Sequence, residues 1–284
     1  MSRPPRLQFP GALYHVTSRG NRRADIYVDA RDHLHWLDTL ADTAARYAFR
    51  VHGYCHMPNH FHLLVETPRA NLARGMAHLN GAYSRWFNHR HGLIGHLFQA
   101  RYHAIVLQKQ THLLELARYT ARNPVRAKLV TDPADWPWTS YMLTQEILPP
   151  PVWLDTNFIL KKFGENRTDA IKAYNQFVRE GIGSANPLFG VKNQLLLGDD
   201  AFIERFQTAS PEQEMGGISR VQRGTMALSL QAYENQYADR DTAIAFAYAT
   251  NAYSMSEIAR HFKVSRTTAS RAVKIWRSRL PGTR

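Results

Sequence analysis

The stretch FRVHGYCHMPNHFHLLVE, residues 49–66, decides the fold. It predicts one strand over residues 49–56 and a second over residues 60–66. Met57-Pro58-Asn59 lies between them and predicts a turn, because proline fixes φ and asparagine tolerates unusual backbone angles. The stretch therefore predicts two consecutive strands joined by a short connection.

Further strands and helices flank this pair. Residues 13–18 alternate with period two and predict a strand, and residues 103–108 predict a fourth one. Helices are predicted over residues 31–48, 71–88 and 111–122. The last should end near Asn123-Pro124, because the residue before a proline avoids the α region.

The order of these elements predicts the fold class. Strand, helix, strand, strand, helix, strand, helix is the split βαβ pattern of a ferredoxin-like α+β fold with an antiparallel sheet. Such a sheet can pack helices on one face and leave the other for a ligand.

Pro149-Pro150-Pro151 is a stiff breaker that indicates a boundary. We expect three parts: an α+β domain over residues 1–148, a helical linker or accessory region over 149–220, and a helical domain over 221–284. Helices are expected beyond the breaker over residues 168–180, 200–207, 221–237, 241–251, 255–262 and 266–278.

The chain is strongly basic, with 36 Lys plus Arg against 23 Asp plus Glu and a net charge of +13. Such an excess attracts polyanions, so nucleic acid is the leading partner, and a solubilising surface charge is the alternative. The single Cys55 excludes an internal disulfide and fits a reducing cytoplasm. No window approaches the run of about 18 apolar residues that a membrane span needs, so no membrane partner is expected.

His60 and His62 are candidate metal ligands. On a strand, residues i and i+2 share a face, so both imidazoles project to one side. The alternative is two surface histidines on a half-exposed sheet. The two other His-x-His pairs are not aimed in this way: His33/His35 lie on a predicted helix, and His89/His91 lie in a predicted polar turn.

Tyr119 and Asn123 are four residues apart and share one face of the predicted helix. Tyr119 is a candidate nucleophile, and the Asn123 amide oxygen is a candidate third ligand. Two imidazoles and an amide are neutral, so a bound cation would keep its full charge for polarising a phosphate. A phenol with a pKa of about 10 needs local activation. The alternative for Tyr119 is an amphipathic core tyrosine.

These motifs together resemble the REP-associated tyrosine transposases, a branch of the HUH single-tyrosine transposases. The resemblance covers about residues 8–142, with the motifs in the same order. It is carried by Pro10-Gly11-Ala12-Leu13-Tyr14-His15-Val16, Ser18-Arg19-Gly20-Asn21-Arg22, His56-Met57-Pro58-Asn59-His60-Phe61-His62-Leu63-Leu64, Gly95-His96-Leu97-Phe98-Gln99-Ala100-Arg101-Tyr102, Arg118-Tyr119, Asn123-Pro124-Val125-Arg126-Ala127 and Trp136-Pro137-Trp138-Thr139-Ser140-Tyr141.

The resemblance implies a bacterial enzyme whose ferredoxin-like HUH domain cuts and rejoins single-stranded DNA. The HUH histidines match His60 and His62, the nucleophile matches Tyr119, and the third ligand matches Asn123. The implied metal is Mg²⁺ or Mn²⁺, and the implied intermediate is a 5′-phosphotyrosine. The implied substrates are repetitive extragenic palindromes folded as hairpins, with a short guide sequence beside the foot.

Several other residues are candidates for holding DNA, with a solvated surface role as the alternative for each. Near the implied catalytic site they are Arg19, Asn21, Arg22, Arg101, Tyr102 and Arg126. Residues 254–276 predict a helix-turn-helix, in which Lys263 occupies the turn position where glycine is commoner. Its second helix offers Arg266, Thr267, Ser270 and Arg271 to duplex DNA. A helical hairpin with a basic, solvated face is the alternative.

Two functions compete with an active transposase. One is a DNA-binding regulator that uses the helix-turn-helix while the N-terminal domain is catalytically idle. The other is an RNA-binding protein, which rests on fold analogy alone. The sequence leaves the oligomeric state open.

Overall fold

The computed structural model describes residues 7–181, 186–191, 195–208, 227–250 and 252–278. Its contacts divide the chain into two compact units, one formed by Pro10–Gly198 and the other by Met1–Phe9 with Asp199–Arg284. Each unit is described by itself. None of the helices in the described part of the chain is both long and apolar enough to span a membrane.

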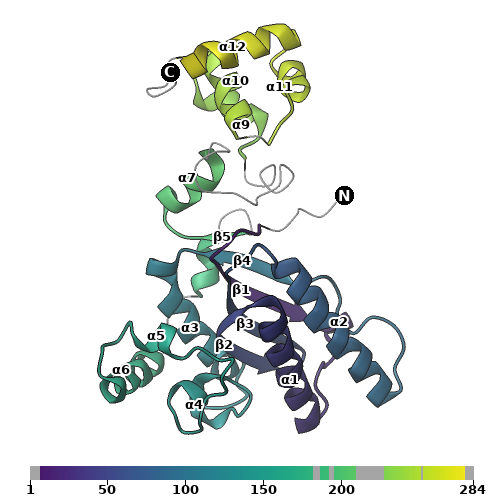
Figure 1. The fold of residues 1–284 in the computed structure, drawn as a ribbon, viewed down its shortest axis with the longest axis vertical. Coiled ribbons are helices and arrows are strands. Elements are labelled where there is room, and N and C mark those ends of the chain that lie inside the picture. Colours follow the sequence, from purple (N-terminus) through teal and green to yellow (C-terminus); the bar gives the residue numbers. More distant parts are fainter. Residues whose placement is uncertain (1–6, 182–185, 192–194, 209–226, 251, 279–284) are drawn as a thin grey trace. The chain divides into compact units, whose positions relative to one another are not determined.

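The larger unit is built on a five-stranded sheet (Figure 1). The sheet order is β2-β3-β1-β4-β5, and the first four strands pair antiparallel as predicted. A fifth strand that the sequence did not predict pairs parallel to β4. The strands are β1 (Ala12–Arg19), β2 (Arg50–Met57), β3 (His60–Thr67), β4 (His103–Leu107) and β5 (Leu196–Leu197).

Helices cover both faces of this sheet. On one face α1 (Ala30–Tyr47) and α2 (Leu72–His91) lie side by side, and Trp36 of α1 meets Phe61 of β3 with ring centroids 4.6 Å apart. On the other face α3 (Lys109–Arg126) packs on β3 in a buried cluster that includes Leu64. Helix α3 therefore covers part of the face that such a sheet can leave for a ligand.

Two sequence-based boundaries were wrong. Helix α3 does not end near Asn123 but continues through Pro124 to Arg126. Proline lacks an N–H and leaves the Thr120 carbonyl without its helical donor, but within the last turn the helix still forms. His89 and His91 lie in the last turn of α2 and not in a connecting turn, because α2 is longer than predicted.

The segment beyond the proline run belongs to the larger unit. Ile159, Leu160 and Val178 join the buried cluster beneath α3. By contacts the chain thus divides after Gly198, whereas the sequence-based division at 148/149 follows composition. The short elements between β4 and β5 include η2 (Pro133–Asp135), α4 (Tyr141–Thr144), α5 (Asn157–Leu160), α6 (Arg167–Glu180) and η3 (Pro187–Gly190).

The smaller unit is helical, as predicted. Its helices are α7 (Asp200–Thr208), α9 (Leu230–Gln236), α10 (Arg240–Ala249), α11 (Met255–His261) and α12 (Arg266–Ser278). The predicted helix over 221–237 begins outside the described residues. Ser254 and Glu257 form a capping box at α11, and Lys263 turns the chain before α12 with φ of 53°. A DNA-binding role for α11 and α12 stays a prediction.

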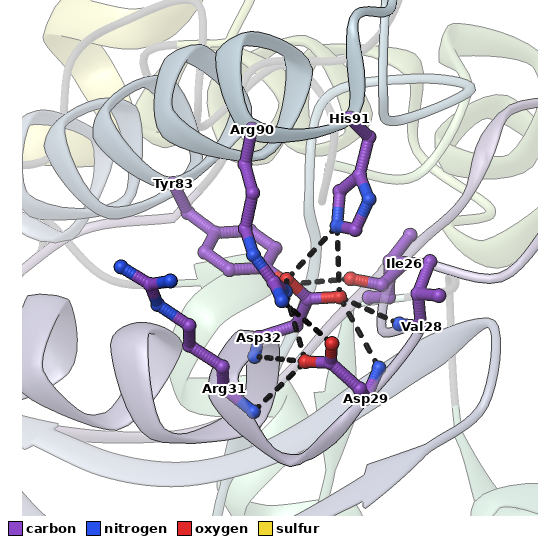
Figure 2. A network of polar contacts seen from close by, with 8 residues as sticks. All are labelled: Ile26, Val28, Asp29, Arg31, Asp32, Tyr83, Arg90 and His91. Carbon is purple, nitrogen blue, oxygen red and sulfur yellow. Dashed lines mark hydrogen bonds and ion pairs between the residues drawn. The ribbon is translucent and has the colours of Figure 1, made fainter.

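A buried polar network fixes the loop that follows β1 (Figure 2). The fully buried Asp32 carboxylate of α1 accepts hydrogen bonds from the Val28 N–H at 2.7 Å, from Arg90 and, at 3.0 Å, from His91 Nε2. Asp29 caps α1 and also binds Arg90. The network thereby joins the loop to the start of α1 and the end of α2.

Candidate active site

The two histidines of the His-x-His motif lie at the start of β3, just after the turn predicted from the sequence. Backbone hydrogen bonds hold this turn against the segment after β1: Gly20 N–H donates to the Asn59 carbonyl at 2.8 Å, and Ile26 N–H donates to the Pro58 carbonyl at 3.0 Å. His60 and His62 face the same side, with ring centroids 5.0 Å apart. The period-two argument for this pair therefore agrees with the geometry.

Each of these imidazoles has one nitrogen engaged in a hydrogen bond. His60 Nδ1 lies 2.7 Å from Asn59 Oδ1, an oxygen that can only accept, so His60 Nδ1 carries the proton. His62 Nδ1 lies 2.9 Å from Nε2 of His15, on the neighbouring strand β1. His62 Nε2 is buried and has no hydrogen-bond partner among the described residues. Such an orphaned nitrogen fits a ligand position.

Tyr119 of α3 lies next to His62 and His15. Its ring centroid is 5.8 Å from that of His62 and 6.2 Å from that of His15, edge-on in both cases. Burial raises the pKa of the Tyr119 phenol, while the Arg126 guanidinium, a hydrogen bond with the Asn186 side chain and the charge of Arg19 lower that pKa. Helix α3 thus brings the predicted nucleophile to the predicted metal ligands.

Asn123 follows one turn after Tyr119 on α3. Its side chain is buried, and its Nδ2 has no hydrogen-bond partner in the part of the chain that the structure describes. An unpartnered buried amide is costly unless a further group completes the site. Nδ2 is a donor that a cation cannot satisfy, so the predicted ligand role falls to the amide oxygen of Asn123.

The donor set fits a divalent cation. Burial lowers the pKa of His60 to about 4 and holds the pKa of His62 well below its ordinary value, so both imidazoles are neutral near pH 7, as metal ligands must be. No three His, Cys, Asp or Glu side chains are grouped to hold a metal among the described residues. The fit rests on two imidazoles together with the Asn123 amide.

The polar residues after β1 lie next to this site. Arg19 pairs with His60 in the β1–β3 register, and its charge lowers the pKa of His60, His62 and Tyr119. Asn21 and Arg22 follow on η1 (Asn21–Arg23), and both side chains are exposed. Arg19 is exposed as well.

The other predicted DNA-binding residues differ in their exposure to solvent. Arg126 is exposed, and its guanidinium carbon lies 5.2 Å from the Tyr119 ring centroid. Arg101 is exposed, but Tyr102 is buried, so its ring offers no open face for stacking on a base. The predicted residues of α12 are exposed and belong to the smaller unit: Arg266, Thr267, Ser270 and Arg271.

Sequence reasoning assigned no role to His15 or to Arg118 and Arg122. His15 reaches His62 only because β1 pairs with β3, a contact between residues 47 positions apart. The arginines carried a local signal, since Arg118, Arg122 and Arg126 recur every four residues on one face of α3. Together with Glu115, Tyr119, Gly181 and Pro187 they line a small pocket.

Three comparisons with known proteins were made. Residues 9–123 match the model of a family described as "Transposase IS200 like". Among solved structures, a REP-associated tyrosine transposase bound to a REP hairpin is 18% identical, and the match covers 49% of this chain and 82% of that chain with a TM-score of 0.43. No curated protein sequence matches the chain. The family match runs from before β1 to Asn123 and so includes both histidines and Tyr119.

Proposed function

We propose that the protein cuts and rejoins single-stranded DNA through Tyr119, as the match of residues 9–123 to the model described as "Transposase IS200 like" suggests. The observation that carries the proposal is the approach of the Tyr119 ring to within 5.8 Å of the His62 ring, although the two residues come from separate segments of the chain.

The ligands of the proposed metal are His60, His62 and Asn123. The donors are neutral nitrogens and an amide oxygen, which Mg²⁺ or Mn²⁺ can accept. When bound, the cation would polarise the scissile phosphate and stabilise charge on the leaving oxygen. His60 and His62 are oriented for this task by their hydrogen bonds to Asn59 and His15.

The reaction is a transesterification. The Tyr119 oxygen forms a bond to phosphorus, the bond between phosphorus and the 3′ oxygen breaks, and the 3′ oxygen takes up a proton as the phenol loses one. The products are a 5′-phosphotyrosine and a free 3′-hydroxyl. Attack by a 3′-hydroxyl reverses the step and rejoins strands without another energy source. Arg19 and Arg126 favour the phenolate and the approach of a phosphate by charge.

The proposed substrate is a palindromic, REP-type hairpin with a single-stranded flank. A single strand can bend its backbone to bring a phosphate into line with the attacking oxygen. The exposed Arg19, Asn21 and Arg22 are proposed to hold that flank, and Arg101 the hairpin. The net charge of +13 supports a nucleic-acid partner.

The test is formation of a covalent adduct. The protein is incubated with labelled single-stranded hairpin DNA and Mn²⁺, and the adduct is resolved on a denaturing gel. We expect Tyr119→Phe to abolish the adduct and Tyr47→Phe, a partly exposed tyrosine on α1, to leave it intact. Adduct formation by Tyr119→Phe at the wild-type level would remove Tyr119 from the proposed role.

We also propose that the smaller unit binds duplex DNA through α12. Arg266, Arg271 and Lys274 are exposed on this helix, whereas Ala269, Ala272 and Val273 are buried against the other helices of the unit. Full-length protein in EDTA should bind duplex DNA, and Arg266→Gln with Arg271→Gln should weaken binding without changing the adduct yield on hairpin DNA. If the wild-type protein forms no adduct with hairpin DNA but binds duplex DNA in EDTA, and His60→Ala leaves that binding intact, the catalytically idle regulator is the better description.

A further inference from the structure

One face of α3 carries a group of arginines beside Tyr119, the proposed nucleophile. Arg118, Arg122 and Arg126 are spaced four residues apart and line one pocket together with Tyr119. Glu115 is the pocket's carboxylate, and it is ion-paired with Arg118. Three arginines and one glutamate thus line this pocket, and Arg126 lies 5.2 Å from the Tyr119 ring centroid, so the pocket lining carries a net positive charge beside Tyr119.

The guanidinium group of Arg122 is partly removed from water, which is unfavourable for a charged group. Its side chain is buried, and it donates hydrogen bonds at 3.2 Å to the backbone carbonyls of Val178 and Arg179. No carboxylate of the described residues pairs with it. Burial, together with the charges of Arg118 and Arg126, lowers the pKa of Arg122. Placing a charge in this way favours a ligand of opposite sign.

The position of Arg118 is fixed by its neighbours. Its guanidinium carbon lies 4.3 Å from the Phe177 ring centroid, and its side chain passes directly over Gly181. A Cβ on Gly181 would come within 2.6 Å of Arg118 Cδ. The lack of a side chain at position 181 therefore gives Arg118 the room to reach the pocket.

We propose that this pocket binds one backbone phosphate of the DNA strand, close to the phosphate that Tyr119 attacks. The inference rests on the proposed function and adds a second anion site to it. Guanidinium groups suit this ligand, because their planar donors match phosphate oxygens in charge and geometry. A phosphate held here would fix the register of the strand across the phenol oxygen, so the pocket positions the scissile bond.

The test measures binding without cleavage. In a Tyr119→Phe background, which prevents cutting, a series of hairpin oligonucleotides carries one neutral methylphosphonate linkage each. The pocket is altered by Arg118→Gln, which removes a charge, and by Gly181→Ala, which keeps every charge but displaces Arg118. The matched control is Arg74→Gln, an exposed arginine on α2 across the sheet. Thermal unfolding of each variant checks that it folds.

In the Tyr119→Phe protein, we expect a methylphosphonate at one position of the DNA to weaken binding about tenfold. When Arg118→Gln or Gly181→Ala is combined with Tyr119→Phe, the same methylphosphonate should no longer weaken binding. Arg118→Gln should also reduce the slope of log K against log salt by about 0.7. The penalty should persist in Arg74→Gln. Because Gly181→Ala displaces Arg118 without removing a charge, it tests whether the position of Arg118 matters as well as its charge.

Two results would overturn the pocket. In the first, each methylphosphonate weakens binding as much in the pocket variants as in Tyr119→Phe alone. In the second, Arg74→Gln abolishes the effect of the methylphosphonate as the pocket variants do, which would indicate that only the overall charge matters. In both cases wild-type protein still forms its Tyr119 adduct, so the proposed function stands. Absence of any hairpin binding and of any adduct would overturn the pocket and the proposed function together.

Discussion

His15 decides which nitrogen of His62 is available to a ligand. The two rings stack at 5.1 Å between centroids, and His15 Nε2 lies 2.9 Å from His62 Nδ1. A lone pair on His62 Nε2 requires the proton on Nδ1, which then donates to His15. His15 is therefore a positioning residue, of the kind that fixes the tautomer and orientation of a metal-binding imidazole.

Replacing His15 should weaken metal binding more than it changes the fold. His15→Ala removes the acceptor for His62 Nδ1–H, and we expect about 10- to 100-fold weaker Mn²⁺ binding. In His15→Gln the amide oxygen can accept the same hydrogen bond, so that variant should recover most of the affinity. The measurement is a calorimetric Mn²⁺ titration without DNA. A folded His15→Ala protein with wild-type affinity for Mn²⁺ would contradict this role.

The residue scale also shows what local pattern can predict. His60 and His62 share a side because a strand has period two, and Tyr119 and Asn123 share a helix because they are one turn apart. Neither argument tells which strand lies beside β3, so His15 was not found. The burial of Tyr102 was also missed, because its motif gave no information on which way the ring faces.

At the scale of elements, α2 contains two glycines with different reasons to be there. A Cβ on Gly75 would lie 2.1 Å from Cζ of Phe49, so the helix approaches the start of β2 too closely for any side chain. A Cβ on Gly81 would meet only the flexible end of Arg85, at 3.4 Å. The two glycines within this helix thus include one that packing requires.

This contrast predicts opposite effects of the same substitution. Gly75→Ala should destabilise the protein by about 1–3 kcal/mol, because Phe49 must move. Gly81→Ala should be neutral or stabilise it by up to about 1 kcal/mol, since alanine is the better helix former. Urea unfolding of both variants measures the difference. Equal midpoints for the two would show that the Phe49 contact does not constrain α2.

The Asp32 network gives a second prediction for the elements (Figure 2). Asp32→Asn removes the buried carboxylate charge that Arg90 and His91 share, while Arg90 keeps its ion pair with Asp29, so we expect a loss of about 1–3 kcal/mol in the free energy of unfolding. Asp38→Asn, exposed on the same helix, is the control and should change stability by less than about 0.5 kcal/mol. Chemical denaturation compares them, and a similar effect of both would refute the network's role.

Helices and strands could be predicted from the sequence where they are long enough to show a repeating pattern of apolar residues. Four strands and the main helices extend over enough residues for a period to be visible. Strand β5 has two residues and pairs with β4 across about 90 positions of sequence, so no local signal could identify it. The end of α3 was missed because a helix tolerates Pro124 in its last turn, where few backbone donors remain to be lost.

At the scale of the whole molecule, the proline run did not mark the end of the larger unit. Residues such as Ile159 and Val178 pack beneath α3, and this depends on the volume left beside the sheet, which composition does not reveal. The basic charge, in contrast, could be interpreted from the sequence. It occurs in both units, at Arg19 and Arg126 near Tyr119 and at Arg266 and Arg271 on α12.

Buried neutral histidines make the whole molecule sensitive to acid. Burial lowers the pKa of His15 to about 3 and of His33 and His60 to about 4, and it holds the pKa of His56 and His62 well below the ordinary value. In the unfolded chain these groups take up protons near pH 6.5. Between about pH 6.5 and 4 the unfolded state therefore binds more protons, and stability falls as the pH falls.

Within this window, each histidine that stays neutral in the folded state should lower the free energy of unfolding by about 1.4 kcal/mol for every unit by which the pH falls. We expect urea midpoints, measured in EDTA so that no metal is linked to unfolding, to drop steeply from pH 7 to pH 5. His33→Gln should remove one histidine's share of this pH dependence. His33 lies on α1, on the other face of the sheet from the proposed metal ligands. His96→Gln, an exposed position, should leave the dependence unchanged. A midpoint that stays constant from pH 7 to pH 5 would mean that these rings gain protons without unfolding, and hence that they are not buried as described.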